Sequence, residues 1–159
     1  MRLFPMLAVA LATAVPASAH VTVWPKSSAP GAHEKYEVRL PNEKEVDTIA
    51  LELRFPAALK VRSLEQKPGW NTELIRDDSG AVTGVRWSGK LAPMQFTEFG
   101  LLATNPATGS DLVWRASQFY ADGTKIEWSG PAGSKTPAPR VTVRPAATTA
   151  PPSAARDSR

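Results

Sequence analysis

The chain has 159 residues, no cysteine, and a formal net charge of +4 at pH 7. The lack of cysteine excludes disulfide bonds and thiolate metal sites, so a stable domain needs a core built from roughly 100 residues or more. The positive charge lies towards the ends, because residues 20–130 hold 13 basic and 14 acidic residues, a net charge of −1. Nucleic-acid-binding domains present a basic face on the fold itself, so we expect no nucleic-acid binding.

Residues 1–19 have the three parts of a secretory signal peptide. Arg2 is followed by an apolar run at residues 7–12, and the small residues Ala17, Ser18 and Ala19 form a cleavage site before His20. The apolar run is shorter than the roughly 20 residues that a transmembrane helix needs. We therefore expect cleavage between Ala19 and His20 and an extracytoplasmic protein, periplasmic or secreted.

The stretch from 20 to 130 alternates apolar and polar residues with a period of two. Turn residues such as Pro68-Gly69 and Asp122-Gly123 separate the alternating runs, and sustained helical periodicity is missing. The pattern predicts strands at residues 36–40, 49–55, 59–64, 70–75, 82–87, 96–104, 112–120 and 124–128. Short strands at this spacing indicate an all-β fold, a single immunoglobulin-like or cupredoxin-like antiparallel β-sandwich over residues 20–130.

Residues 131–159 are rich in proline, alanine, serine and threonine and contain few large apolar side chains. Such a tail cannot bury enough surface to offset the entropy of ordering it, so we expect disorder and no membrane anchor. The segment 140–143 has strand character, but flanking prolines argue against pairing.

The sequence contains none of the common catalytic motifs. A Gly-rich phosphate loop, a Gly-x-Ser-x-Gly elbow and a nucleophilic cysteine are all missing, which favours a binding domain over an enzyme. A mature N-terminal His20 would offer its α-amine and its ring Nδ1 for metal chelation. Glu52 points away from the core face of its predicted strand, as a solvent-facing glutamate or as a ligand. Trp128 ends the last strand, where core or rim packing is the ordinary role.

Several motifs in order along the domain resemble the YcnI family of copper-binding domains. They are HVTVWP (20–25), VRLPNE (38–43), LELRFP (51–56), PGW (68–70), WSG (87–89), FTEF (96–99), QFYADG (118–123) and EWSGP (127–131). The resemblance implies a β-sandwich that binds one Cu(II) per chain in a monohistidine brace formed by His20 and Glu52, with Trp128 nearby as a cap. A slip of alignment in the loop after Pro41 makes Glu43 the reserve carboxylate, and Glu98 is a weaker reserve.

Three function classes follow. The first is copper trafficking or homeostasis, with the copper ion and another periplasmic copper chaperone or a membrane copper transporter as partners. The second is a copper-dependent oxidative enzyme similar to lytic polysaccharide monooxygenases, which needs a second histidine, for which His33 is the candidate. The third is a metal-free immunoglobulin-like interaction module. Because Met94 is the sole mature methionine, the first class favours Cu(II) over Cu(I) and predicts release on reduction.

Overall fold

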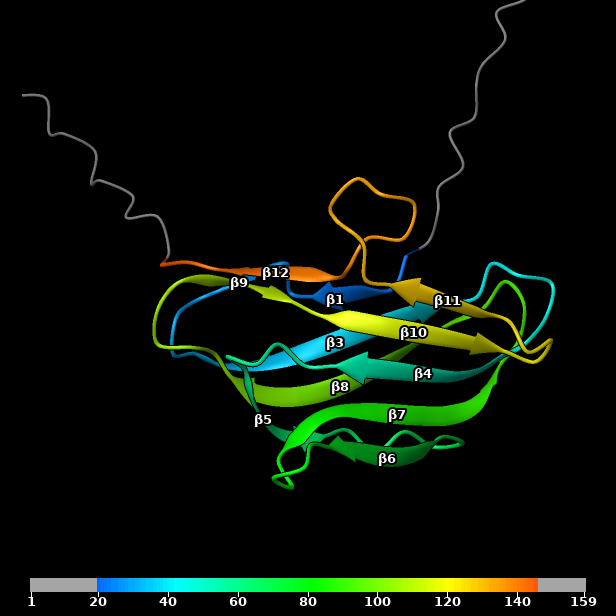
Figure 1. Ribbon diagram of the computed structural model, residues 1–159, viewed down its shortest axis with the longest axis horizontal. Coiled ribbons are helices and arrows are strands. Elements are labelled where there is room, and N and C mark those ends of the chain that lie inside the picture. The colour runs from blue at the N-terminus through cyan, green and yellow to red at the C-terminus, as the bar shows by residue number, and fades with distance from the viewer. Residues whose placement is uncertain (1–19, 146–159) are drawn as a thin grey trace, which may run out of the picture.

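The computed structural model describes residues 20–145, which form twelve β-strands and no helix (Figure 1). The prediction of an all-β antiparallel sandwich is therefore confirmed. Within this stretch, no helix is long and apolar enough to cross a membrane. The proposed signal peptide at residues 1–19 and the end of the tail at residues 146–159 lie outside the described residues.

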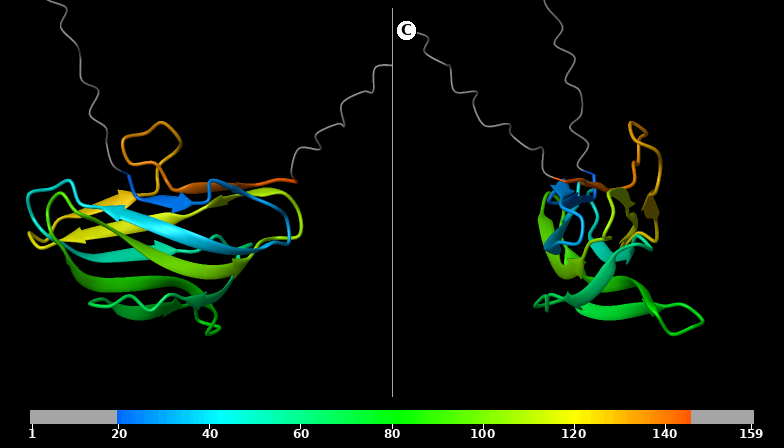
Figure 2. Two further views of the ribbon diagram at one scale, coloured as in Figure 1. Left: turned by 180° about the vertical axis from the view of Figure 1, so that it is seen from behind. Right: turned by 90° about the vertical axis from the view of Figure 1, so that its left-hand side faces the viewer.

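Two sheets form the two layers of the sandwich, which the end-on view shows most clearly (Figure 2). The four-stranded sheet has, in spatial order, β1 (Thr22–Trp24), β3 (His33–Pro41), β8 (Phe96–Thr104) and β5 (Lys60–Leu64). The five-stranded sheet has β11 (Lys125–Trp128), β10 (Arg115–Tyr120), β4 (Thr48–Arg54), β7 (Val82–Leu91) and β6 (Asn71–Arg76). All neighbours within these two sheets are antiparallel.

A small third sheet closes one side of the sandwich. It consists of β2 (Ser27–Ser28), β12 (Arg140–Val143) and β9 (Ser110–Val113), with β12 parallel to β2 and antiparallel to β9. The segment between β11 and β12 projects above the sandwich as a loop before β12 returns to it (Figure 1, orange).

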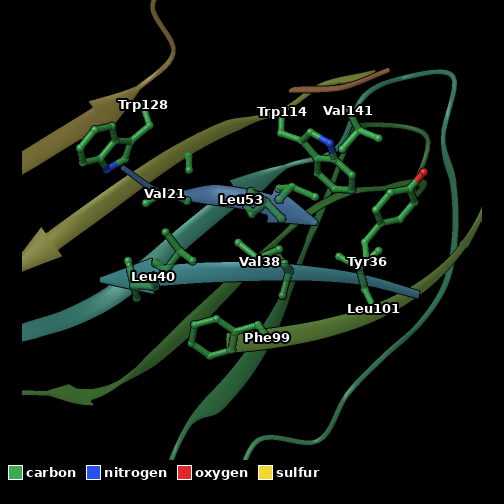
Figure 3. Close-up of a cluster of buried hydrophobic side chains, with 14 of the residues drawn as sticks. Val21, Tyr36, Val38, Leu40, Leu53, Phe99, Leu101, Trp114, Trp128 and Val141 are labelled. Atoms are coloured by element: carbon green, nitrogen blue, oxygen red, sulfur yellow. The ribbon is translucent and has the colours of Figure 1, made fainter. Parts of the chain in front are cut away.

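The core lies between the layers because the alternating strands each turn one apolar face inward. In β3, Tyr36, Val38 and Leu40 are fully buried, whereas the polar residues between them face outward. The buried hydrophobic side chains form one cluster. Trp128 and Leu40 lie at one end of it, and Tyr36 and Trp114 lie at the other (Figure 3). We call these the Pro41 end and the His33 end, after the last and first residues of β3.

The prediction of disorder from residue 131 is wrong for β12. Val141 and Val143 are fully buried, and the strand pairs along its length with β9. The prolines at 139 and 145 flank the strand without interrupting it, and the Pro139 carbonyl accepts a hydrogen bond of 2.9 Å from the Trp114 amide. Proline has no N–H to donate to a β-ladder, but it can flank a paired strand, and its carbonyl can still accept a hydrogen bond. The domain therefore extends past residue 130, at least to Val143.

The predicted strand at 112–120 is two strands. The chain leaves β9 after Val113, and Trp114 is fully buried at the junction before β10 begins at Arg115. β9 pairs with β12, whereas β10 pairs with β4 and β11, so the chain changes sheet at this tryptophan. An unbroken alternating pattern does not distinguish such a crossing from one long strand.

Candidate metal centre

His20 and Trp128 are in contact at the Pro41 end. Thr22 of β1 pairs with Arg39 of β3, so the chain two residues earlier, at His20, is level with Pro41. The imidazole of His20 meets the indole of Trp128 edge to face, with ring centres 5.3 Å apart and planes at 87°. Trp128 is buried and His20 is half-buried. The structure therefore brings together two of the three residues that the resemblance implied.

A pocket of about 180 Å³ opens beside Trp128, the buried member of this aromatic pair. Its walls come from the end of β3 and the loop after it, from the inner face of β10 and β11, and from the loop before β12. They are Pro41, Glu43, Lys44, Gln118, Tyr120, Ile126, Trp128, Lys135 and Thr136. Glu43, the reserve carboxylate of the sequence analysis, is thus in the same pocket as Trp128.

The backbone on both sides of Glu43 is held in place by its neighbours. The buried side chain of Asn42 donates hydrogen bonds to the carbonyls of Val46 (2.8 Å) and Leu91 (3.0 Å), and it accepts one from the Lys44 amide. Lys44 Nζ donates to Thr124 Oγ1 at 2.6 Å. These bonds give the Glu43 segment a defined position at the pocket before any ligand arrives.

Tyr120 lines the floor of the pocket. Burial raises the pKa of its hydroxyl to about 12, with further contributions from the carboxylates of Glu43 and Asp122. The ammonium of Lys44 lies 4.2 Å from the centre of the Tyr120 ring, within cation–π range. Tyr120 is therefore a neutral, apolar wall with one phenol group at neutral pH, not an anionic donor.

Glu52 lies on the other face of the five-stranded sheet. Ser117 of β10 pairs with Glu52, whereas the adjacent Ala116 pairs with both Leu53 and Trp128. Because neighbouring residues of a strand point to opposite faces, Glu52 and Trp128 point in opposite directions. The Glu52 carboxylate is engaged on that outer face by Arg54 (2.9 Å) and Arg86 (3.7 Å).

The two remaining reserve residues also lie away from the pocket. Glu98 is paired on the outer face of the four-stranded sheet with Arg39, at 2.8 Å. His33 begins β3, and its Nδ1 lies 3.2 Å from Thr104 Oγ1. At about 3.3 Å per residue, the length of β3 separates His33 from Pro41 by roughly 26 Å. His33 is thus at the opposite end of the strand from His20.

The candidate donors are the carboxylate of Glu43, which lines the pocket, and the imidazole of His20, which contacts Trp128 but does not itself line the pocket. Within residues 20–145, no cluster of three His, Asp or Glu side chains could hold a metal ion. A metal at this pocket would therefore need a third donor, and cleavage before His20 would supply an α-amine on the same residue as the imidazole. Amine, imidazole and carboxylate are nitrogen and oxygen donors that suit a divalent first-row metal.

Sequence reasoning did not identify Gln118 as part of the pocket. Gln118 is 1% exposed and stands between Ala116 and Tyr120 on the inward-facing side of β10. The sequence did contain an indication of this role. Gln118 is a polar residue at an inward position of an alternating strand, and glutamine is seldom fully buried. Lys135 and Thr136 fell within the tail that was expected to be disordered.

Two comparisons by sequence connect the chain to known proteins. The model of a family described as a domain of unknown function, DUF1775, matches residues 20–148. The copper-binding protein CutI of Bacillus subtilis is 37% identical over 124 residues, which cover 77% of this chain and 61% of CutI. The chain therefore matches less than two thirds of the length of that relative.

Solved structures agree with the observed fold. An uncharacterized protein from Nocardia farcinica with an immunoglobulin-like fold superposes with a TM-score of 0.65 at 28% identity, covering 78% of this chain and 97% of that one. A cohesin from Acetivibrio cellulolyticus scaffoldin B has a TM-score of 0.50 at 10% identity, covering 79% and 98%. The second likeness is one of fold alone.

Proposed function

This chain belongs to the DUF1775 family, in agreement with the resemblance of its sequence to the YcnI proteins, and on this basis we propose that it is an extracytoplasmic Cu(II)-binding protein. One Cu(II) binds per chain at the Pro41 end, and the protein transfers it to another copper protein. The copper ion is the cargo of the protein.

The observation that carries this proposal is the contact between His20 and Trp128 beside the pocket that contains Glu43. Cleavage before His20 turns its backbone nitrogen into an amine, so amine and imidazole can chelate one ion. N-terminal amines have an ordinary pKa of about 7.7–8.0, so Cu(II) has to displace a proton at neutral pH.

In this proposal Glu43, not Glu52, is the carboxylate of the site. Glu43 lines the pocket next to Trp128, and it is close enough to Tyr120 to raise the pKa of that phenol. Glu52 points away from the pocket and interacts with two arginines. The choice rests on the pairing of β10 with β4 and β11, which turns Glu52 and Trp128 to opposite faces of the sheet, and on the place of Glu43 in the wall of the pocket.

Transport of copper is a better match to this arrangement than oxidation catalysed by copper. Copper oxygenase chemistry of the kind considered from the sequence needs a second histidine, and His33 lies at the far end of β3. Met94, the sole methionine of the domain, is 93% exposed at the β7–β8 turn. A soft ligand set for Cu(I) is thus missing from residues 20–145, which supports release of the ion on reduction.

The deciding experiment compares a chain that begins at His20 with one that has a single extra residue before it. The extra residue turns the α-amine of His20 into an amide and moves the free amine one residue away, while the imidazole is kept, so we expect tight one-to-one Cu(II) binding by the first protein alone, measured by titration and by EPR. Equal binding by both proteins, or by neither, would contradict the proposal.

The carboxylate is tested in the same assay. Glu43→Gln should weaken Cu(II) binding by about 10–100-fold and change the EPR parameters, because an anionic oxygen is lost. Glu52→Gln is the matched control, and its Cu(II) affinity should stay within about twofold of the parent protein. The reverse result would restore Glu52 as the ligand.

A further inference from the structure

The buried amide of Gln118 is an unusual feature of the core. Its side chain is 1% exposed and is surrounded by the inward faces of β3, β4 and β11. A buried amide without hydrogen bonds is destabilising, so the partners of such a group reveal which parts of the fold it joins.

The hydrogen bonds of Gln118 fix the orientation of its amide. Nε2 donates to the carbonyl of Pro41 at 2.9 Å and to Thr48 Oγ1 at 2.8 Å. Both protons of the NH₂ group are then used, and Oε1 accepts a long hydrogen bond of 3.4 Å from Trp128 Nε1. The flipped amide would place the NH₂ group against the indole N–H, two donors facing each other. One orientation alone satisfies all three partners.

Two of these partners lead to the candidate copper ligands. Pro41 is the last residue of β3, two positions before Glu43, and Trp128 is in contact with the imidazole of His20. Gln118 thus joins the segment with the carboxylate to the indole that supports the histidine. Its bond to Trp128 also directs the indole N–H towards the core, so the carbon edge and face of the ring remain for His20 and the pocket.

We propose that Gln118 is a positioning residue of the copper site: it holds the Glu43 segment and the Trp128 indole in one fixed relation. This inference rests on the proposed function, because it concerns the same site. Gln118 does not ligate the ion in this proposal, and its effect reaches the ion through Pro41 and Trp128.

A purely structural role is the competing explanation, and the molecule offers a matched control for it. Asn105 is also a buried amide, 4% exposed, and it too has three hydrogen-bond partners: Tyr36, Ser28 and Ala29. It lies at the His33 end, next to Thr104, which pairs with His33. Its loss should destabilise the fold without moving the copper site.

The test compares Gln118→Leu with Asn105→Leu in protein that begins at His20. We expect both variants to unfold at lower urea concentration than the parent protein. Only Gln118→Leu should weaken Cu(II) binding, by about 10–100-fold, which is the usual range for groups that orient metal ligands. Its EPR parameters should also change, whereas Asn105→Leu should keep the parent EPR spectrum and an affinity within about twofold.

A milder variant and a metal-free measurement keep the test decisive if Gln118→Leu fails to fold. Thr48→Val removes just the hydroxyl that anchors the Gln118 amide. In the metal-free protein, the ring current of Trp128 sets the proton shifts of the His20 imidazole, and we expect Thr48→Val to move those NMR signals while Asn105→Leu leaves them in place.

The outcomes separate this inference from the proposed function. If the parent protein does not bind Cu(II), the proposed function fails, and the His20 shifts still test whether Gln118 positions Trp128. If the parent binds Cu(II) but the folded Gln118 and Thr48 variants keep its affinity, EPR spectrum and His20 shifts, Gln118 is structural and the inference is overturned.

Discussion

The two ends of β3 have similar side chains but different environments. Each end has a histidine, a buried amide and a tyrosine: His20, Gln118 and Tyr120 at the Pro41 end, and His33, Asn105 and Tyr36 at the other. At the His33 end, the Tyr36 hydroxyl donates to Asn105 Oδ1 at 2.6 Å, and Asn105 Nδ2 donates to Ser28 Oγ at 2.8 Å. Ser28 Oγ in turn donates to Glu34 at 2.6 Å, which completes a continuous network.

At the Pro41 end the polar groups surround a pocket. Gln118 uses its hydrogen bonds to hold the backbone at Pro41 and the indole of Trp128, while Glu43 and Lys44 line the pocket. The tyrosine there packs beneath a lysine, 4.2 Å away. Similar residue types at the two ends therefore produce a closed network in one place and a pocket in the other. What matters is whether the polar groups bond to one another or are held around a space that a ligand can enter.

The segment after Gly130 contributes residues to both ends of the sandwich, so removing it should disrupt the structure at both. Lys135 and Thr136 line the pocket, and Val143 pairs with Ser28 at the His33 end. A chain that ends at residue 130 loses the burial of Val141 and Val143, each of which contributes about 1.5–3 kcal/mol. We expect a loss of at least about 3 kcal/mol in the free energy of unfolding, measured in urea.

A chain that ends at residue 145 is the control for this truncation, and it should keep the stability of the full mature protein. Equal stability of the two shortened chains would mean that β12 adds nothing to the fold.

The two histidines give the sharpest contrast in metal binding. His20→Ala should lower Cu(II) affinity by at least about 100-fold, or about 2.7 kcal/mol, because the chelate loses its imidazole. His33→Ala should leave the affinity unchanged, because that ring lies beside Thr104 at the far end of β3. Titration of both variants with Cu(II) checks this. A loss of affinity in His33→Ala would bring the second histidine, and with it the oxidative enzyme, back into consideration.

The smallest expected effect concerns the tyrosine at the Pro41 end at high pH. Burial raises the pKa of Tyr120 to about 12, above the value near 10 that a tyrosine has in an unfolded chain. Its contribution to stability is complete below pH 10 and is lost as the pH rises through about 12, because the unfolded state then releases the proton more readily. Tyr120→Phe should therefore lose less stability than the parent protein between pH 9 and about 11.5, measured by urea denaturation.

Tyr36 remains in both proteins of that comparison, and burial raises its pKa as well. Part of the loss of folding stability at alkaline pH should therefore persist in Tyr120→Phe. Parallel pH profiles for the two proteins would contradict the assignment of the shift to Tyr120.

The alternating pattern was sufficient for most of the fold. Eight runs were predicted as strands, and each overlaps a strand of the structure, because alternating apolar residues need a buried face and a solvent face. The pattern could not show the change of sheet at Trp114, where a buried residue lies between two ladders. It also missed β12, since composition indicated disorder and the partners of Val141 and Val143 are far away in sequence.

For the candidate site, the family resemblance pointed to His20 and Trp128 and named Glu43 as a reserve carboxylate, and the structure brings the His20 and Trp128 rings into contact beside a pocket that Glu43 lines. The resemblance favoured Glu52 and kept Glu43 in reserve, because local sequence does not show which sheet face the strand with Glu52 turns towards the pocket. The pairing of β10 with β4 and β11 places Glu52 on the outer face, and the hydrogen bonds of Asn42 and Gln118 hold the exposed Glu43 segment at the edge of the pocket. Local sequence specifies strands and termini through short-range patterns, whereas a binding site requires long-range contacts that form when the sheets pack together.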